Sequence, residues 1–174
     1  MKMQFTYNIF LIGFMGSGKS TVADYLCEKF DMDVVEMDQV IAERERMSIS
    51  DIFEKHGELY FRDLETKLLV ELQEKTNTVV SCGGGVAMRE CNVTEMKKNG
   101  KVVLLTAKPE TILKRVVNNH DRPLLENNKT VAYIAELMEK RREKYETAAD
   151  MIIETDGKSA QKICEEMIQR LGEQ

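Results

Sequence analysis

The stretch GFMGSGKS at residues 13–20 has the spacing G-x-x-x-x-G-K-[ST] of a phosphate-binding loop. Its glycines let backbone N–H groups curl round phosphate oxygens, and the helix that follows turns its positive end towards them. Lys19 would reach the β- and γ-phosphates of a nucleoside triphosphate, and Ser20 would hold Mg²⁺ directly. The residues predicted to contact the nucleotide are Gly13, Gly16, Ser17, Gly18, Lys19, Ser20 and Thr21.

The flanking sequence supplies the elements that such a loop needs. An apolar run at Asn8–Ile12 comes before it, and Val22, Leu26 and Phe30 repeat every four residues after it. The first pattern is typical of a buried strand and the second of a helix. A glycine-rich turn with an accidental Lys-Ser would not require this context.

Strands and helices alternate along the rest of the chain. Short apolar runs rich in Val and Ile are typical of strands buried on both faces, and they lie at 33–37, 78–82, 101–106 and 151–154. Helical patterns lie between them, such as the stripe of Phe61, Leu64, Leu68 and Leu72. This alternation predicts a three-layer α/β/α fold with a parallel sheet, and 174 residues suit a single domain.

Composition narrows the classes of function. The net charge of −5 argues against nucleic acid or an acidic membrane as the main partner, and no apolar run approaches the ~20 residues of a membrane span. The four cysteines form no C-x-x-C pair, and there are only two histidines. We therefore expect free thiols, no zinc site and a cytoplasmic location.

The sequence VVSCGGGVAM at 79–88 ends an apolar run in three glycines, Gly83, Gly84 and Gly85. One glycine would be enough for a turn. Three in a row indicate a backbone surface that is kept bare so that another group can approach closely.

The acids near these motifs favour a kinase over other proteins with a phosphate-binding loop. Motor and signalling proteins usually end an apolar strand in Asp for the metal, whereas the run at 78–82 ends without an acid. NNKT at 127–130 lacks the Asp of the guanine motif N-K-x-D. The second strand does end in acids, Glu36 and Asp38, and the polar, arginine-bearing stretch at 118–129 is typical of a mobile loop. Together these features favour a small-molecule kinase.

Taken together, the motifs resemble the shikimate kinase family over nearly the whole chain. They are GFMGSGKST at 13–21, MD at 37–38, SISDIFEKHGELYFRDLE at 48–65, SCGGGVA at 81–87, DRPLL at 121–125, and KR at 140–141 with a later Tyr145. The resemblance implies transfer of the γ-phosphate of ATP to the 3-hydroxyl of shikimate, a step towards chorismate and the aromatic amino acids. It also implies a single kinase domain over 1–174, the strand order 2-3-1-4-5, a substrate-binding helical segment at about 38–67 and a short lid at about 118–129.

The resemblance also assigns residues to the two substrates. The residues implied to bind shikimate are Asp38, Arg62, Gly83, Gly84, Gly85 and Arg141. Arg62 and Arg141 would bind its carboxylate, because a planar guanidinium matches a carboxylate bidentately. Asp38 would accept hydrogen bonds from its hydroxyls, and the three glycines would leave room for this compact substrate.

Three residues would act on the phosphoryl group, namely Lys19, Asp38 as candidate base, and Arg122 from the lid. Arg115 and Arg122 would also contact ATP, Arg115 beside the adenine. Glu36 and Ser81 would meet Mg²⁺ through water. The family usually has D-x-D where this chain has Glu36-Met37-Asp38, so the first acid is one CH₂ longer here.

Alternatives remain open at the level of residues and of function. Arg62 could be a solvated helix arginine paired with Glu58 and Glu65, and Arg142 is a rival for the role of Arg141. Another kinase of this fold, acting on gluconate or a nucleoside monophosphate, is the second hypothesis. A nucleotide-dependent binding protein without transfer activity is the third. We expect a monomer with shikimate and ATP as its small-molecule partners.

Overall fold

The computed structural model describes residues 4–117 and 130–172. Its sheet has five parallel strands in the order β2-β3-β1-β4-β5, as predicted. The strands are β1 Asn8–Ile12, β2 Asp33–Glu36, β3 Thr78–Ser81, β4 Gly100–Thr106 and β5 Met151–Glu154. Every strand run expected from the sequence is therefore a strand, and the boundaries differ by one residue at most.

Helices connect these strands. The α-helices are α1 Lys19–Phe30, α2 Met37–Glu45, α3 Ile49–His56, α4 Glu58–Glu71, α5 Glu90–Lys98, α6 Pro109–Val116, α7 Val131–Ala148 and α8 Ala160–Gly172. Within the described residues there are also the short 3₁₀ turns η1 Leu72–Glu74 and η2 Val86–Met88. Side-chain caps explain two of the starts: the hydroxyl of Ser48 accepts from the backbone N–H of Asp51 before α3, and that of Thr130 accepts from Tyr133 before α7.

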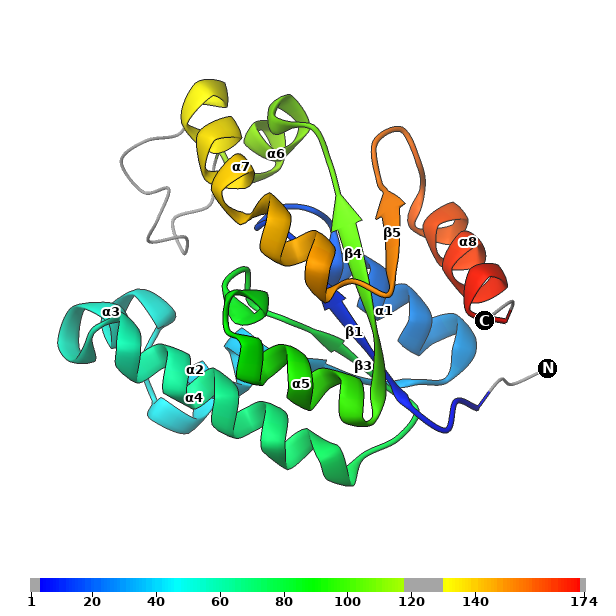
Figure 1. Cartoon of the computed structure of the whole chain (residues 1–174), viewed down its shortest axis with the longest axis horizontal. Coiled ribbons are helices and arrows are strands. Elements are labelled where there is room, and N and C mark those ends of the chain that lie inside the picture. Colours follow the sequence, from blue (N-terminus) through cyan, green and yellow to red (C-terminus); the bar gives the residue numbers. More distant parts are fainter. Residues whose placement is uncertain (1–3, 118–129, 173–174) are drawn as a thin grey trace.

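Helices cover both faces of the sheet (Figure 1). On one face, α1 and α8 pack against inward residues such as Leu11 and Val103. On the other, α4, α5 and α7 pack against Phe10, Val80 and Leu104. Side chains of the central strands β1, β3 and β4 alternate between the two cores, because successive residues of a strand point to opposite faces. The three layers expected from the sequence are therefore present. The edge strand β5 buries only Met151 and Ile153, so the expectation that 151–154 is buried on both faces was wrong.

The strands end at a common edge, which collects the loops with chemical groups. β1 leads into the phosphate-binding loop, β2 into α2 with Asp38, and β3 into the three glycines. The predicted strand at 33–37 stops at Glu36 because Met37, fully buried, begins α2. In open parallel sheets, ligands bind at this edge beside the point where the strand order reverses.

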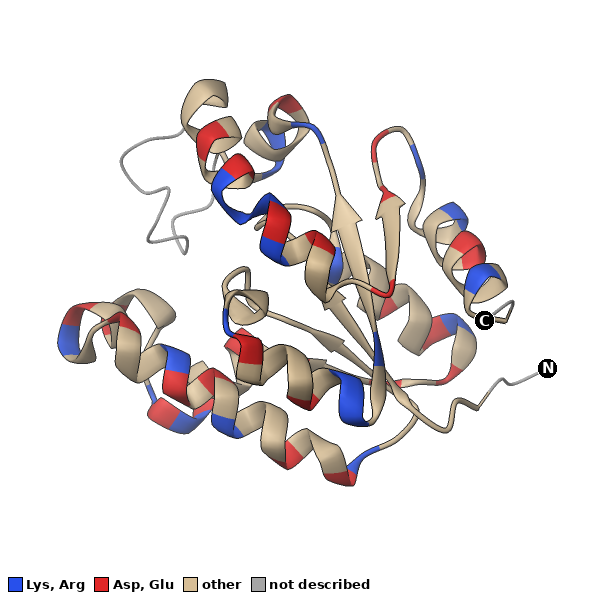
Figure 2. Ribbon diagram, in the orientation of Figure 1, with Lys and Arg blue, Asp and Glu red and all other residues tan. Residues whose placement is uncertain are grey.

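Charged residues lie mainly on the helices, and the centre of the sheet is free of them (Figure 2). The large buried side chains of β1, such as Ile9 and Leu11, have no exposed surface. Among the helices at 4–117 and 130–172, none combines the length and the apolar character that a bilayer crossing requires.

Candidate active site

The phosphate-binding loop is held open by its glycines. Gly18 stands at the N-cap of α1 with φ of 104°, a left-handed value that other residues rarely adopt. A Cβ on Gly13 would overlap the carbonyl oxygen of Leu105. The ammonium of Lys19 donates to the carbonyl oxygens of Gly13, at 2.6 Å, and Phe14, at 3.2 Å. The lysine therefore lies inside the curve of the loop.

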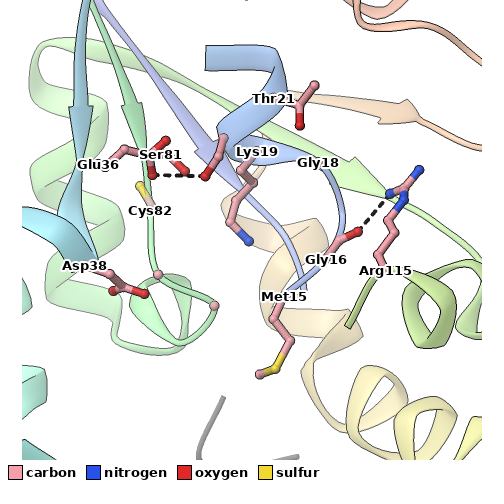
Figure 3. Close-up of a pocket in the computed structure, with 13 residues that line it drawn as sticks. Met15, Gly16, Gly18, Lys19, Thr21, Glu36, Asp38, Ser81, Cys82 and Arg115 are labelled. Carbon is pink, nitrogen blue, oxygen red and sulfur yellow. Dashed lines mark hydrogen bonds between the residues drawn. The ribbon is translucent and has the colours of Figure 1, made fainter. Parts of the chain in front are cut away.

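One cavity of about 260 Å³ unites the loop with the strand ends (Figure 3). It brings together most of the residues predicted for ATP, the metal and shikimate. Its lining consists of Met15, Gly16, Gly18, Lys19, Ser20, Thr21, Glu36, Asp38, Ser81, Cys82, Gly83, Gly84 and Arg115. In Figure 3, Glu36 and Ser81 lie on one side of the loop and Arg115 on the other.

The proposed metal residues meet at one corner of this cavity. The hydroxyl of Ser20 donates to Glu36 Oε2 at 3.1 Å, and Glu36 is the register partner of Ser81 in the sheet. Partial burial raises the pKa of Glu36, while the hydroxyls of Ser20 and Ser81 oppose the shift. Oxygen donors of this kind suit Mg²⁺. In the described part of the chain no three His, Cys, Asp or Glu residues form a metal cluster.

Arg115 and Ser17, both predicted to contact the nucleotide, have contacts outside this cavity. Arg115, on α6, donates to the carbonyl oxygen of Gly16 at 2.8 Å and to the hydroxyl of Thr155 at 3.4 Å. Its guanidinium thus lies over the loop, at the side where α6 and the end of β5 meet. The backbone N–H of Ser17 donates to the carbonyl oxygen of Phe14, and Ser17 is one of the residues around a second cavity of about 390 Å³.

The three glycines leave space for charged side chains. A Cβ on Gly85 would overlap the guanidinium of Arg62, and one on Gly84 would lie 3.1 Å from Arg141 Nη1. None of the three has a left-handed φ, so close approach, rather than an unusual backbone conformation, explains them. Arg62 comes from α4 and Arg141 from α7, and they converge on adjacent residues of the loop after β3.

Arg141 and its neighbour Arg142 point in different directions. Arg141 Nη1 donates to the carbonyl oxygen of Gly84 at 3.1 Å, and its guanidinium lies 5.8 Å from the ring centre of Phe14. Arg142 is exposed and pairs with Glu139 and Glu146 on its own helix. Of the two rivals, Arg141 is therefore the one at the glycines.

Arg62 is more enclosed than a solvated helix arginine. Its side chain is only 14% exposed and lies 5.3 Å from the ring centre of Phe61. It does pair with both acids that the sequence suggested, Glu58 at 3.2 Å and Glu65 at 2.8 Å. The two acids differ, since the side chain of Glu58 is 59% exposed and that of Glu65 is fully buried.

Two carboxyl groups flank Gly83. A Cβ there would lie 2.6 Å from Glu65 Oε2 and 3.0 Å from Asp38 Oδ1. Burial raises the pKa of Glu65 to about 7; the nearby Arg62 works against this and Asp38 adds to it. Asp38 stands in the first turn of α2, two residues after the N-cap Glu36.

The site includes two side chains that the sequence did not single out as functional. Glu65 was only a possible partner of Arg62, and its burial could not be seen from helix periodicity. Tyr145 was part of the motif at 140–145 but had no assigned role, and its hydroxyl donates to the carbonyl oxygen of Gly84 at 2.5 Å. Besides its place in that motif, its sequence signal was its position four residues after Arg141, one helical turn along the same face. The predicted lid at 118–129, with Arg122, lies outside the described residues.

Comparison with known proteins agrees with this arrangement. The family model described as shikimate kinase matches residues 15–172. A shikimate kinase of Sulfurihydrogenibium sp. is 44% identical over 94% of this chain and 97% of its own length, and that of Persephonella marina is 44% identical over 94% and 98%. The chain belongs to the shikimate kinase family. The predicted family and the predicted class, an ATP-dependent phosphotransferase, are thereby confirmed.

Solved structures of a shikimate kinase and of a gluconokinase differ in how closely they match this chain. A shikimate kinase from Acinetobacter baumannii, in complex with shikimate, has a TM-score of 0.90 at 33% identity and covers 95% of this chain and 92% of its own. A gluconokinase from Sinorhizobium meliloti has a TM-score of 0.61 at 17% identity, covering 98% and 94%. Its likeness shows a common fold alone.

Proposed function

We propose that this protein transfers the γ-phosphate of ATP to the 3-hydroxyl of shikimate, giving shikimate 3-phosphate and ADP. The observation that carries the proposal is the convergence of Arg62 and Arg141 on the glycines, beside Asp38 and the phosphate-binding loop. Two guanidinium groups and a carboxylate around a small space match an acid that also carries hydroxyls.

In this proposal the arginines fix the acceptor. Arg62 and Arg141 bind the carboxylate of shikimate, and Gly83, Gly84 and Gly85 provide a bare backbone against its ring. Asp38 accepts a hydrogen bond from the 3-hydroxyl and so orients its oxygen towards the γ-phosphate. Positioning of this kind supplies much of the rate in phosphoryl transfer.

The phosphate-binding loop fixes the donor. Gly13, Gly16, Gly18 and Thr21 surround the phosphates of ATP together with Ser17, and Arg115 contacts its base. The oxygen of the 3-hydroxyl bonds to the γ-phosphorus as the bond to the bridging oxygen of ADP breaks, and the hydroxyl proton passes to Asp38. Lys19 neutralises charge on the transferring group. Arg122 is assigned the same task from the lid at 118–129, and this assignment rests on the sequence alone.

Ser20 would hold Mg²⁺ directly, with Glu36 and Ser81 reaching it through water. When bound, the metal neutralises charge on the phosphate oxygens.

We assign the whole chain, 1–174, to one kinase domain in which α2, α3 and α4 form the substrate-binding segment at about 38–67. The expectations of a cytoplasmic monomer, without nucleic acid or membrane as partner, stay predictions.

A coupled assay of ADP release tests the proposal. Shikimate, quinate, gluconate and nucleoside monophosphates are offered at equal concentration with ATP and Mg²⁺. Shikimate is expected to give the highest kcat/KM. A higher value for gluconate or a nucleotide would replace the proposal with the second hypothesis, and nucleotide binding without ADP release would favour the third.

A further inference from the structure

The carbonyl groups of the three glycines are satisfied in different ways. Gly83 accepts from the N–H of Val86, and Gly85 accepts from the N–H of Met88, both at 3.1 Å. These are local bonds of the turn that leads into η2. The carbonyl oxygen of Gly84 instead accepts from side chains of α7, a helix that runs past this turn (Figure 1).

Two residues one helical turn apart share that carbonyl. The hydroxyl of Tyr145 donates to Gly84 O at 2.5 Å, and Arg141 Nη1 donates to it at 3.1 Å. Arg141 Nη1 also lies 3.5 Å from the hydroxyl oxygen of Tyr145. Tyr145 is 5% exposed, and burial raises its pKa, so the hydroxyl stays protonated and can donate.

Substrate binding would change the hydrogen-bond partners of the Arg141 guanidinium. A carboxylate that is bound bidentately takes two of the five N–H groups of a guanidinium and fixes the orientation of its plane, so the bond from Arg141 Nη1 to Gly84 has to give way wherever the two geometries differ. If Arg141 were the sole donor to Gly84, its departure would leave a half-buried carbonyl without a partner, which costs free energy. The shorter bond from Tyr145 removes that cost.

We propose that Tyr145 is a positioning residue for shikimate binding: its hydroxyl holds the Gly84 carbonyl and thereby leaves the Arg141 guanidinium available to the substrate carboxylate. The inference rests on the proposed function, because it needs Arg141 to bind that carboxylate. Tyr145 itself does not have to touch either substrate. It also ties the glycine loop to α7, so the two walls of the substrate site keep a fixed separation.

Tyr145→Phe tests this, because it keeps the ring that packs in the core and removes only the hydroxyl. The loss of one net hydrogen bond predicts that the KM and Kd for shikimate rise about three- to tenfold, with kcat and the KM for ATP unchanged. Tyr25→Phe, on α1 away from the site, is the matched control and should leave all four constants unchanged. Thermal melting of both variants checks that they are folded.

A double-mutant cycle with Arg141→Ala separates positioning from a general structural effect. If the hydroxyl acts through Arg141, adding Tyr145→Phe to Arg141→Ala weakens shikimate binding no further. Full additivity would overturn the inference, as would an unchanged shikimate Kd in Tyr145→Phe. A wild-type protein that binds ATP and does not bind shikimate would instead refute the proposed function.

Discussion

The guanidinium of Arg62 lies against the α-carbon of Gly85, where a Cβ would overlap it. The arginine comes from α4 and the glycine from the loop after β3, so their contact joins the substrate-binding segment to the sheet edge. Arg62 is also enclosed by Phe53 and Phe61, whose ring centres lie 5.8 Å and 5.3 Å away. These neighbours leave the guanidinium little room to move aside.

Gly85→Ala should therefore damage the shikimate site. The added methyl displaces the guanidinium of Arg62, which is the end of a long side chain, so the cost should lie at the low end of the about 1–3 kcal/mol typical of overpacking. We expect the KM for shikimate to rise at least about fivefold while the KM for ATP changes little. Gly172→Ala, which adds a methyl in open space, is the control. Equal kinetics for Gly85→Ala and wild type would show that Arg62 need not occupy its present position.

Adjacent arginines on α7 provide a second comparison. Arg141→Ala should raise the shikimate Kd about thirtyfold or more, because truncating one partner of a buried charged pair costs about 2–5 kcal/mol. Arg142→Ala should leave that Kd nearly unchanged, because Arg142 is exposed and pairs with Glu139 and Glu146. Calorimetric titration with shikimate measures both. The reverse result would reassign the role to Arg142.

Lys19 should matter for the chemical step more than for acceptor binding. Its ammonium lies within the phosphate-binding loop, 2.6 Å from the carbonyl oxygen of Gly13. Removal of one group that stabilises transition-state charge costs about 10²–10³ in kcat. We expect Lys19→Ala, and Arg122→Ala by the sequence assignment, to show losses of this size with a nearly unchanged KM for shikimate. Wild-type turnover at saturating substrates would remove the residue concerned from the mechanism.

The sequence was sufficient to predict the strands and the α/β class because these signals are local. Flat apolar runs at Asn8–Ile12 and Met151–Glu154 match β1 and β5 to the residue. The observed strand boundaries differ from the predicted ones where tertiary packing determines them. Met37 is an example, because its burial places it in α2 and not in β2. Strand order was beyond periodicity and came from the resemblance.

The site could be predicted from the sequence only where a motif fixes the spacing. The phosphate-binding loop is contiguous, so its geometry follows from its residues. The contacts of Arg62 with Gly85 and of Tyr145 with Gly84 join segments far apart in the chain, and no local pattern shows them. The buried state of Glu65 is equally hidden, because an acid beside an arginine on a helix is typical of an exposed pair.

Glu36 stands where the family usually has Asp, and two substitutions test what its carboxylate does. Glu36→Asp should remain active, because either side chain can reach a water of the metal. Glu36→Gln keeps the shape and loses the charge, so it should need about tenfold more Mg²⁺ for half-maximal rate. A Mg²⁺ titration in which Glu36→Gln follows the wild-type curve would show that this carboxylate does not act on the metal.

Glu65 should make the stability of the protein depend on pH. Burial raises the pKa of this carboxyl from its usual 4.5 to about 7 in the folded protein. Between these two values the unfolded chain ionises Glu65 while the folded protein keeps it protonated, so the free energy of unfolding falls as pH rises through this window. The loss is on the order of 3 kcal/mol and is complete once pH exceeds the folded pKa.

Replacement of Glu65 by glutamine should remove this part of the pH dependence. Glu65→Gln keeps the shape and a hydrogen-bonding group but does not titrate, so between pH 5 and 7 its melting temperature should fall less than that of the wild type. Glu58→Gln is the matched control, because Glu58 pairs with the same Arg62 from the solvent side, with 59% of its side chain exposed. Its pH dependence should follow the wild type. Parallel melting curves for wild type and Glu65→Gln across this range would mean that Glu65 is ionised in the folded protein throughout, held by Arg62 at 2.8 Å.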